Sequence, residues 1–177
     1  VKLEVVDENI IRVIASPGKQ FPQSESLVTS YQRKPSIQWT LSSAKEKLTL
    51  KTRLLTAIIH LKTGAVSFWD IKGKKILAEK TTHGRNFKPV VYDGKRSYQL
   101  IQTFQSSQGE AYYGLGQHQD GTFNYKGHQV SLFQNNTEVA IPFLISNKNY
   151  GILWDNYALT SAGDTRPVKT SETYSGI

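Results

Sequence analysis

EAYYGLGQHQD, at residues 110–120, decides the fold together with VSLFQNNTEVAIPFLISNKNYGILWDN at residues 130–156. Gly114 and Gly116 are separated by one residue, and glycine permits backbone angles and close approaches that a Cβ forbids. The run from Tyr112 is therefore predicted to be an aromatic strand that enters a constrained turn. Rigid strands that hold a polar, aromatic loop after such a turn are typical of sugar sites. A simple β-bulge followed by a solvated loop is the alternative interpretation.

Composition indicates a folded, globular protein. The chain has 177 residues, of which 38% are hydrophobic and 11% aromatic, so it is long enough to bury a real core. This length fits one all-β domain or, less well, two small ones. The chain contains no cysteine, which excludes disulfides and thiolate metal sites.

The net charge is positive but diffuse. Lys and Arg total 22 against 14 acidic residues, a formal charge of +8, and the basic residues are scattered without an Arg-rich stripe. We therefore expect no nucleic-acid partner. No apolar run approaches the length of a membrane helix, and no signal peptide is visible. The chain begins with Val1 and lacks Met throughout, so we expect a processed product or an excised piece whose ends need not be those of the gene.

Apolar and polar residues alternate along most of the chain, which is the period of a strand with one buried face. Short turns separate the alternating runs, so neighbouring strands are expected to pair as antiparallel hairpins. The expected strands include 1–5, 11–15, 27–31, 37–41, 48–50, 54–61, 65–69, 75–78, 98–105, 141–145 and 150–154. More than ten short strands with regularly spaced turns predict an all-β fold, an antiparallel β-sandwich of two packed sheets.

Three segments break the alternation. Residues 42–47 are predicted to form a turn or two of helix at most, and residues 81–96 an irregular crossing between the two halves of the chain. Pro142 lies within an apolar strand, where proline is tolerated only near an edge or a bulge.

Motifs of catalysis are absent from the sequence. It contains no Gly-x-Ser-x-Gly and no phosphate-binding glycine loop, and its four histidines lack metal-ligand spacing, so neither a metal site nor a cofactor is expected. A retaining glycosidase needs two carboxyl groups about 5 Å apart, a distance that a sequence does not supply. The carboxylates from which such a pair could be drawn are Glu110, Asp120, Glu138 and Asp155.

Three blocks carry a resemblance to a known family. Tyr113-Gly114-Leu115-Gly116 is followed by residues 130–138 and then by residues 141–143 and 149–156, in an order and spacing that resemble the N-terminal β-sandwich of glycoside hydrolase family 31. In this family the domain is a galactose-mutarotase-like supersandwich. The ending Trp154-Asp155-Asn156-Tyr157 is most similar to the bacterial α-xylosidase branch. Residues 9–13 resemble the family's opening strand more weakly.

The resemblance implies that the parent protein is a retaining, exo-acting α-glycosidase that releases α-linked xylose or glucose. Its nucleophile and general acid would be aspartates on a (β/α)8 barrel that follows, so no catalytic residue is expected in this chain. The sandwich would pack on that barrel. Residues 1–165 would form the N-terminal domain, and residues 166–177 would begin the connection to a following module or to the barrel. A polysaccharide substrate would favour export to the periplasm or the cell surface.

The resemblance also implies a substrate-binding loop at the rim of the pocket. The loop commonly reads Trp-Asn-Arg-Asp, and the matching positions here are Phe133, Gln134, Asn135 and Asn136, which all differ from it. A carboxylate in the last position accepts two strong hydrogen bonds, whereas Asn136 offers one acceptor and one amide donor group. Phe133 would either stack on a sugar or pack in the core.

A second class of function remains open. A free-standing carbohydrate-binding or mutarotase-like β-sandwich would need a histidine and a glutamate that converge in a groove. His118 or His128 together with Glu138 could supply that pair.

Overall fold

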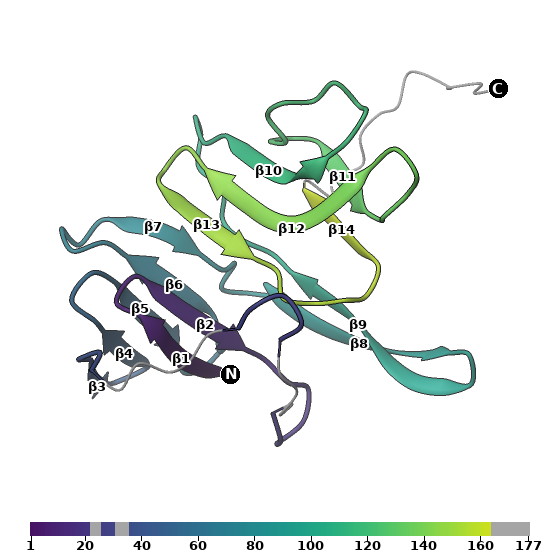
Figure 1. The fold of residues 1–177 in the computed structure, drawn as a ribbon. Helices are drawn as coiled ribbons and strands as arrows, with labels where there is room; N and C mark the ends of the chain where they lie inside the picture. The colour runs from purple at the N-terminus through teal and green to yellow at the C-terminus, as the bar shows by residue number, and fades with distance from the viewer. Residues whose placement is uncertain (22–25, 31–35, 164–177) are drawn as a thin grey trace. The chain divides into compact units, whose positions relative to one another are not determined.

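The computed structural model describes residues 1–21, 26–30 and 36–163, and within these ranges the chain is all-β with antiparallel strand pairing (Figure 1). The described residues form no helix, and thus none long and apolar enough to cross a membrane. The chain divides into two compact units, residues 1–106 and 107–177. The domain boundary predicted at residue 165 lies outside the described residues, so it stays a prediction.

The strands of the first unit are β1 (Lys2–Asp7), β2 (Ile10–Ile14), β3 (Thr40–Ala44), β4 (Lys47–Lys51), β5 (Thr56–His60), β6 (Val66–Trp69), β7 (Lys75–Ala78), β8 (Arg85–Tyr92) and β9 (Lys95–Gln102). They form a five-stranded sheet, in the order β3-β4-β5-β6-β7, and two hairpins, β1-β2 and β8-β9. Consecutive strands are neighbours in each sheet, as the predicted succession of hairpins requires.

The core of the first unit joins the β1-β2 hairpin to the five-stranded sheet. Ala57 and Ile59 alternate along β5 with less buried residues, and Val66 of β6 completes the buried cluster. The partly buried side chains packed against this cluster come from both layers and are Leu3, Ile11, Val13, Leu48 and Phe68. The period of two therefore buries one face of each sheet, as predicted from the sequence.

A buried ion pair ties β8 to the edge of the five-stranded sheet. The Arg85 guanidinium donates two hydrogen bonds to the Glu79 carboxylate, at 2.5 and 2.6 Å, and Val66 N donates a third at 3.0 Å. The Arg85 and Glu79 side chains are only 12% and 5% exposed. Burial raises the pKa of Glu79, and the Arg85 charge and these hydrogen bonds oppose that shift. The pair is thus costly to break from either side.

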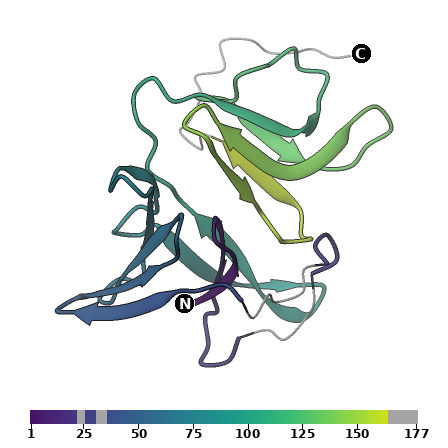
Figure 2. The same ribbon diagram turned by 60° about the vertical axis from the view of Figure 1, so that its left-hand side comes forward.

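The described part of the second unit, residues 107–163, has two sheets, formed by the strands β10 (Tyr112–Gln117), β11 (Gln129–Leu132), β12 (Val139–Ser146), β13 (Tyr150–Leu153) and β14 (Thr160–Gly163). One sheet has the order β10-β12-β13, with β12 in the middle (Figure 2), and the other pairs β11 with β14. Leu115, Tyr125 and Val130 are buried between the two sheets. They pack against side chains from both, which are Tyr112, Leu132, Leu144 and Ala162.

The opposite face of β12 is apolar but exposed in the structure. Val139, Ile141, Phe143 and Ile145 are each 40–50% exposed and alternate with the residues that face the core. This alternation confirms the predicted strand at 141–145, and residues 147–149 form the predicted turn into β13.

The sequence prediction for residues 42–47 was wrong. These residues form the end of β3, a tight turn and the start of β4, in a hairpin that runs from Thr40, opposite Lys51, to Ala44, opposite Lys47. Lys45 takes a left-handed backbone conformation, with φ of 49°, at the turn. Pairing with the rest of a five-stranded sheet outweighs the weak local preference for helix.

The prediction of an irregular crossing at 81–96 was also wrong. Strand β8 pairs along its whole length with β9, and Pro89 lies opposite Tyr98. In a two-stranded ribbon both strands are edges, so a missing N–H can be tolerated. Asp93 and Gly94 both have positive φ, 49° and 71°, as an Asp-Gly hairpin turn requires. This dipeptide was the overlooked signal.

The strand expected at 27–31 is not found over residues 27–30, which form a bend without ladder hydrogen bonds. Residue 31 lies outside the described residues.

Candidate functional site

Strand β10 continues through the Gly-Leu-Gly segment without the predicted constrained turn, and the segment lies opposite extra residues of β12. The alternative interpretation, a β-bulge, is therefore the one found, and we call this irregularity the Gly-Leu-Gly bulge. Residues 114, 115 and 116 all have positive φ, of 99°, 64° and 106°. Gly114 pairs with Leu144 and Gly116 with Ala140, so three residues of β12 lie opposite Leu115 alone. Leu115 is consequently turned into the core, where it is 3% exposed.

Neither glycine of this bulge can carry a side chain. A Cβ on Gly114 would lie 2.4 Å from the carbonyl oxygen of Phe143, and one on Gly116 would lie 1.8 Å from that of Val139. Pro142 lies in the bulged part of β12, where the ladder is interrupted and a missing N–H costs little. This position agrees with the expectation that Pro142 lies near a bulge.

The predicted substrate-binding residues, 133–136, form an exposed loop between β11 and β12. Asn135 and Glu138 pair as an isolated bridge, and Glu138 N donates to Asn135 O at 3.1 Å. The Gln134 side chain closes the loop, because its Nε2 donates to Glu138 O at 3.0 Å and its Oε1 accepts from Ala140 N at 3.2 Å. Gln134 therefore shapes the loop.

All four residues of the loop are exposed, and the side chains of two of them, Phe133 and Asn136, take no part in the hydrogen bonds that close it. Phe133 is 57% exposed, so among the described residues it is not part of the core. Asn136 is exposed, and its backbone N–H donates to Asn135 Oδ1 at 2.8 Å. Within the described ranges the side-chain amide of Asn136 has no hydrogen-bond partner, which leaves its donor and acceptor available to a ligand.

His118 lies beside this loop, and its ring is buried. Its Nε2 is 2.9 Å from Leu115 O, and its Nδ1 is 3.8 Å from Glu138 Oε2. The ring meets that of Tyr125 edge-on, with centroids 6.3 Å apart, and the His118 side chain is 4% exposed. The structure thus brings Glu138 to His118, whereas His128 is exposed at the start of β11. A buried ring with one nitrogen held by a backbone carbonyl is poorly placed to exchange protons with a sugar.

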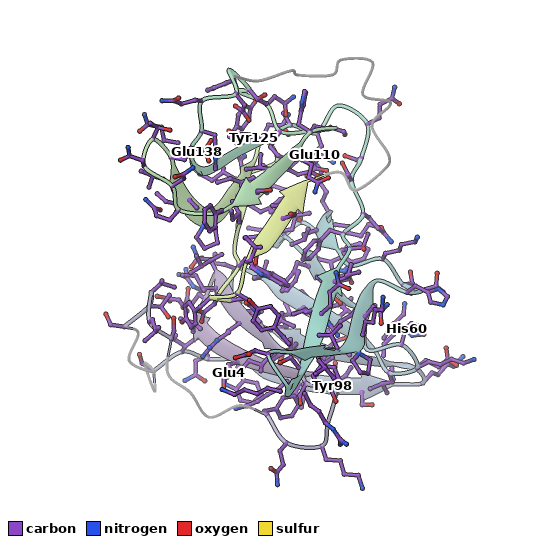
Figure 3. The ribbon with its side chains drawn as sticks, turned by 90° about the vertical axis from the view of Figure 1, so that its right-hand side faces the viewer. Glu4, His60, Tyr98, Glu110, Tyr125 and Glu138 are labelled. Carbon is purple, nitrogen blue, oxygen red and sulfur yellow. The ribbon has the colours of Figure 1, made fainter. Side chains whose placement is uncertain are left out.

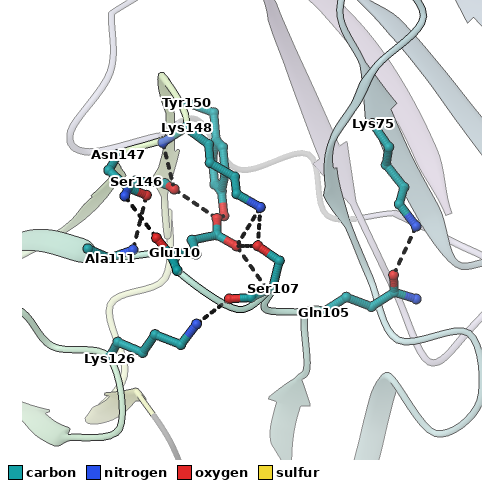
Figure 4. Close-up of polar contacts among 11 residues, drawn as sticks. Lys75, Gln105, Ser107, Glu110, Ala111, Lys126, Ser146, Asn147, Lys148 and Tyr150 are labelled. Carbon is teal, nitrogen blue, oxygen red and sulfur yellow. Dashed lines mark hydrogen bonds and ion pairs between the residues drawn. The ribbon is translucent and has the colours of Figure 1, made fainter.

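Glu110 is a buried carboxylate that accepts several hydrogen bonds (Figure 4). Its Oε1 accepts from Tyr150 Oη at 2.6 Å and from Ser146 Oγ at 2.8 Å, and its Oε2 accepts from Ser107 N at 3.1 Å. Lys148 Nζ lies 3.5 Å from Oε2. Burial would raise the pKa of Glu110, but these hydrogen bonds and the Lys148 charge together lower it to about 2. Glu110 is therefore a charged structural clamp and not a general acid.

Each of the other three candidate carboxylates has a partner of its own. Figure 3 shows Glu110 and Glu138 well apart in the second unit. Asp120 accepts from Thr122 N at 2.9 Å, and Asp155 accepts from Tyr157 Oη at 2.7 Å. No group of three or more potential metal ligands is found in the described part of the chain.

The sequence did not predict two sets of interactions in the second unit, those of Glu110 and the contact of His118 with Leu115. Glu110 was considered as a catalytic carboxylate, and the structure instead surrounds it with donors from three segments of the chain. The contact between His118 and Leu115 was also missed, although it spans only three residues. A histidine shortly after a glycine-flanked bulge is the signal that could have indicated it.

Comparison with known proteins gives a consistent family assignment. The family model described as "Glycosyl hydrolase 31 N-terminal galactose mutarotase-like domain" matches residues 1–162. The chain is 34% identical over 171 residues to an α-xylosidase of Saccharolobus solfataricus, covering 91% of this chain and 23% of that protein. It is 31% identical to an uncharacterized family 31 glucosidase of Pseudescherichia vulneris, covering 91% of this chain and 34% of that one.

Solved structures agree with this assignment. The crystal structure of a family 31 α-xylosidase from Xanthomonas citri superposes with a TM-score of 0.85 at 44% identity, covering 93% of this chain and 18% of that chain. A family 31 α-xylosidase from a soil metagenome, in complex with xylose, has a TM-score of 0.78 at 25% identity, with 90% of this chain and 26% of that chain covered. The chain thus spans a minor part of each relative's length.

Proposed function

Because this chain belongs to glycoside hydrolase family 31, as its N-terminal galactose mutarotase-like domain, we propose that it serves a retaining, exo-acting α-glycosidase that releases α-linked xylose or glucose. Similarity to three α-xylosidases supports xylose as the first sugar to test. In this proposal the nucleophile and the general acid lie on a (β/α)8 barrel outside this chain. The domain packs on that barrel, and export is favoured if the substrate is a polysaccharide.

The domain's contribution is the loop at residues 133–136. Phe133 offers an exposed aromatic face for a sugar ring, and Asn136 offers one amide donor group and one acceptor to sugar hydroxyls. In two-step retaining hydrolysis one carboxyl group protonates the leaving group while the other attacks the sugar and forms a covalent glycosyl-enzyme, which water then hydrolyses. Residues of the rim bind and orient the sugar for that pair.

The observation that carries the proposal is the combination of a fixed backbone and free side chains. Gln134 and the Asn135–Glu138 bridge hold the main chain of the loop, while Phe133 and Asn136 remain exposed. A preorganised loop loses little entropy when a ligand binds, which is the property expected of a recognition loop.

Substitution of Asn136 tests the role of the loop in the full-length enzyme. Asn136→Ala should raise KM or lower kcat by about tenfold, on the order of 1.4 kcal/mol, because one or two sugar hydrogen bonds are lost. Asn86→Ala, at an exposed position of β8 in the first unit, is the matched control and should leave both parameters unchanged. Unchanged kinetics for a folded Asn136→Ala enzyme would remove Asn136 from the site.

The isolated chain tests whether the chemistry lies elsewhere. Purified 1–177 should hydrolyse neither aryl α-xylosides nor aryl α-glucosides, and should bind free sugars only in the roughly millimolar range, since a few exposed hydrogen bonds barely offset the entropy of association. A polarimetric assay of sugar anomerisation addresses the mutarotase-like alternative. Catalysed anomerisation that disappears on substitution of His118 or Glu138 would establish that alternative instead.

A further inference from the structure

We propose that His118 and Glu138 are positioning residues, which together fix the substrate loop at residues 133–136 relative to the Gly-Leu-Gly bulge. The inference rests on the proposed function of that loop and names two further residues on which substrate recognition depends. Neither side chain is proposed to touch the sugar.

The first link runs from the bulge to the imidazole. Leu115 lies in the left-handed region with φ of 64°, at the point where the ladder between β10 and β12 is interrupted. A carbonyl oxygen only accepts hydrogen bonds, so the 2.9 Å contact with Leu115 O means that His118 Nε2 carries the hydrogen and donates it. His118 thereby satisfies a backbone carbonyl of the bulge and is itself held by it.

The second link runs from the imidazole to the loop. With Nε2 fixed on Leu115 and the ring edge-on to Tyr125, Nδ1 faces the Glu138 carboxylate at 3.8 Å. At this distance the carboxylate lies against the edge of the ring, so the position of each side chain limits that of the other. The ring is 4% exposed and the Glu138 side chain 35% exposed, so a partly exposed side chain of the loop is placed against a buried, fixed ring.

The third link is the backbone of Glu138 itself. Glu138 pairs with Asn135 through its N–H and accepts from Gln134 Nε2 through its carbonyl oxygen. Asn136 lies inside this closed turn, directly after Asn135. A side chain that anchors Glu138 to His118 therefore orients the turn relative to β10 and sets the direction in which Asn136 points.

A second histidine–glutamate pair supplies a matched control. His60 Nε2 lies 3.7 Å from Glu46 Oε2, in the first unit, and the Glu46 side chain is 64% exposed. The residue types match those of the His118–Glu138 pair and the distance is similar, but His60 and Glu46 belong to the other unit. A general effect of losing such a pair should appear equally in both sets of variants.

The kinetic test uses the full-length enzyme with His118→Gln, Glu138→Gln and the double variant. We expect KM to rise about fivefold in each while kcat changes less than about twofold, because a misplaced rim weakens binding of ground state and transition state alike. The double variant should be no worse than the more damaged single variant, as for two residues that act through one contact. His60→Gln and Glu46→Gln should leave KM unchanged.

Backbone amide exchange of the 177-residue chain supplies the second readout. Exchange at residues 135–138 should accelerate about tenfold in His118→Gln and in Glu138→Gln, whereas exchange within β12 should not change. Acceleration across the whole second unit would overturn the proposal, since His118 and Glu138 would then only support the fold. Additive KM effects, or a KM effect equal to that of the His60 and Glu46 variants, would overturn it as well.

The two proposals fail in different ways. Asn136→Ala could leave the kinetics unchanged while Glu138→Gln still accelerates amide exchange at residues 135–138 alone. The loop's role in substrate recognition would then be refuted, and the positioning of the loop by His118 and Glu138 would be supported. If Asn136→Ala impairs the enzyme but neither His118→Gln nor Glu138→Gln alters KM or loop exchange, the positioning proposal alone is refuted. Glu138→Gln keeps the size of a partly exposed side chain, so it should fold even if His118→Gln does not.

Discussion

Replacement of Glu110 by glutamine should remove a large electrostatic contribution to the stability of the second unit. Glutamine keeps the shape of the side chain but loses the charge that Tyr150, Ser146 and Lys148 stabilise. The Glu110 side chain is only 3% exposed, so water does not replace the lost interactions easily.

The magnitude follows from the pKa of Glu110. A pKa of about 2 in the folded chain, against an ordinary value of 4.5, corresponds to about 3 kcal/mol of stability at neutral pH. A lowered carboxyl pKa stabilises the folded state fully above pH 4.5, and the contribution is lost as the pH falls toward 2. About 1.5 kcal/mol should remain at pH 3.

Urea unfolding of the 177-residue chain measures this contribution. Trp154 lies in the second unit, so its fluorescence reports on that unit once Trp39 and Trp69 of the first unit are replaced by phenylalanine. In this background Glu110→Gln should cost about 3 kcal/mol at pH 7 and about half of that at pH 3. The partly exposed Glu138 is the control, and Glu138→Gln should cost less than about 1 kcal/mol at pH 7.

Two results would refute this account of Glu110. A penalty below about 1 kcal/mol at pH 7 would mean that its hydrogen bonds do not outweigh the cost of burying the charge. A penalty that is the same at pH 3 as at pH 7 would mean that the charge is not the stabilising feature.

Two further predictions concern stability. Gly116→Ala should lower the free energy of unfolding in urea by at least about 3 kcal/mol, because its Cβ would meet the carbonyl oxygen of Val139. Gly73→Ala, whose Cβ would have nothing within 4 Å, should lower it by only about 1 kcal/mol. Similar losses in the two variants would contradict the clash. Arg85→Ala should lower the free energy of unfolding in urea by about 3–5 kcal/mol, because Glu79 is left buried without its cation. Arg85→Lys keeps the charge and should lower it less. Equal losses in the two variants would contradict the role of the ion pair.

The sequence by itself determined the kind of structure that this chain forms. The strand at 75–78 and the hairpin from residue 141 to residue 154 follow from alternation and turn residues, which are local properties. The two glycines beside Leu115 indicated a constrained backbone, since only glycine avoids the clashes found there, but the constraint is a bulge in the ladder and not the turn that was predicted. The order of the motif blocks was enough to indicate the family that the comparisons show.

Local pattern was insufficient where pairing partners decide the outcome. Residues 81–96 contain a proline and several charges, and they still form most of the β8-β9 hairpin because β9 supplies a full-length ladder. The helix considered at 42–47 gave way to a hairpin for the same reason. Ladder hydrogen bonds form between segments, so their gain is not visible in either segment alone.

Only the tertiary structure decided which polar side chains meet. Glu110 and Glu138 look alike in the sequence. The pairing of β12 with β10 and with β13 brings Ser146 and Tyr150 to Glu110, and the bulge at Leu115 brings His118 to Glu138. Glu110 is a buried carboxylate that holds together neighbouring segments of the second unit, whereas Glu138 is partly exposed and belongs to the loop at its surface. The roles differ because charge–charge and hydrogen-bond energies depend on distances of a few ångströms, which are set by strand register and bulge geometry and not by spacing along the chain.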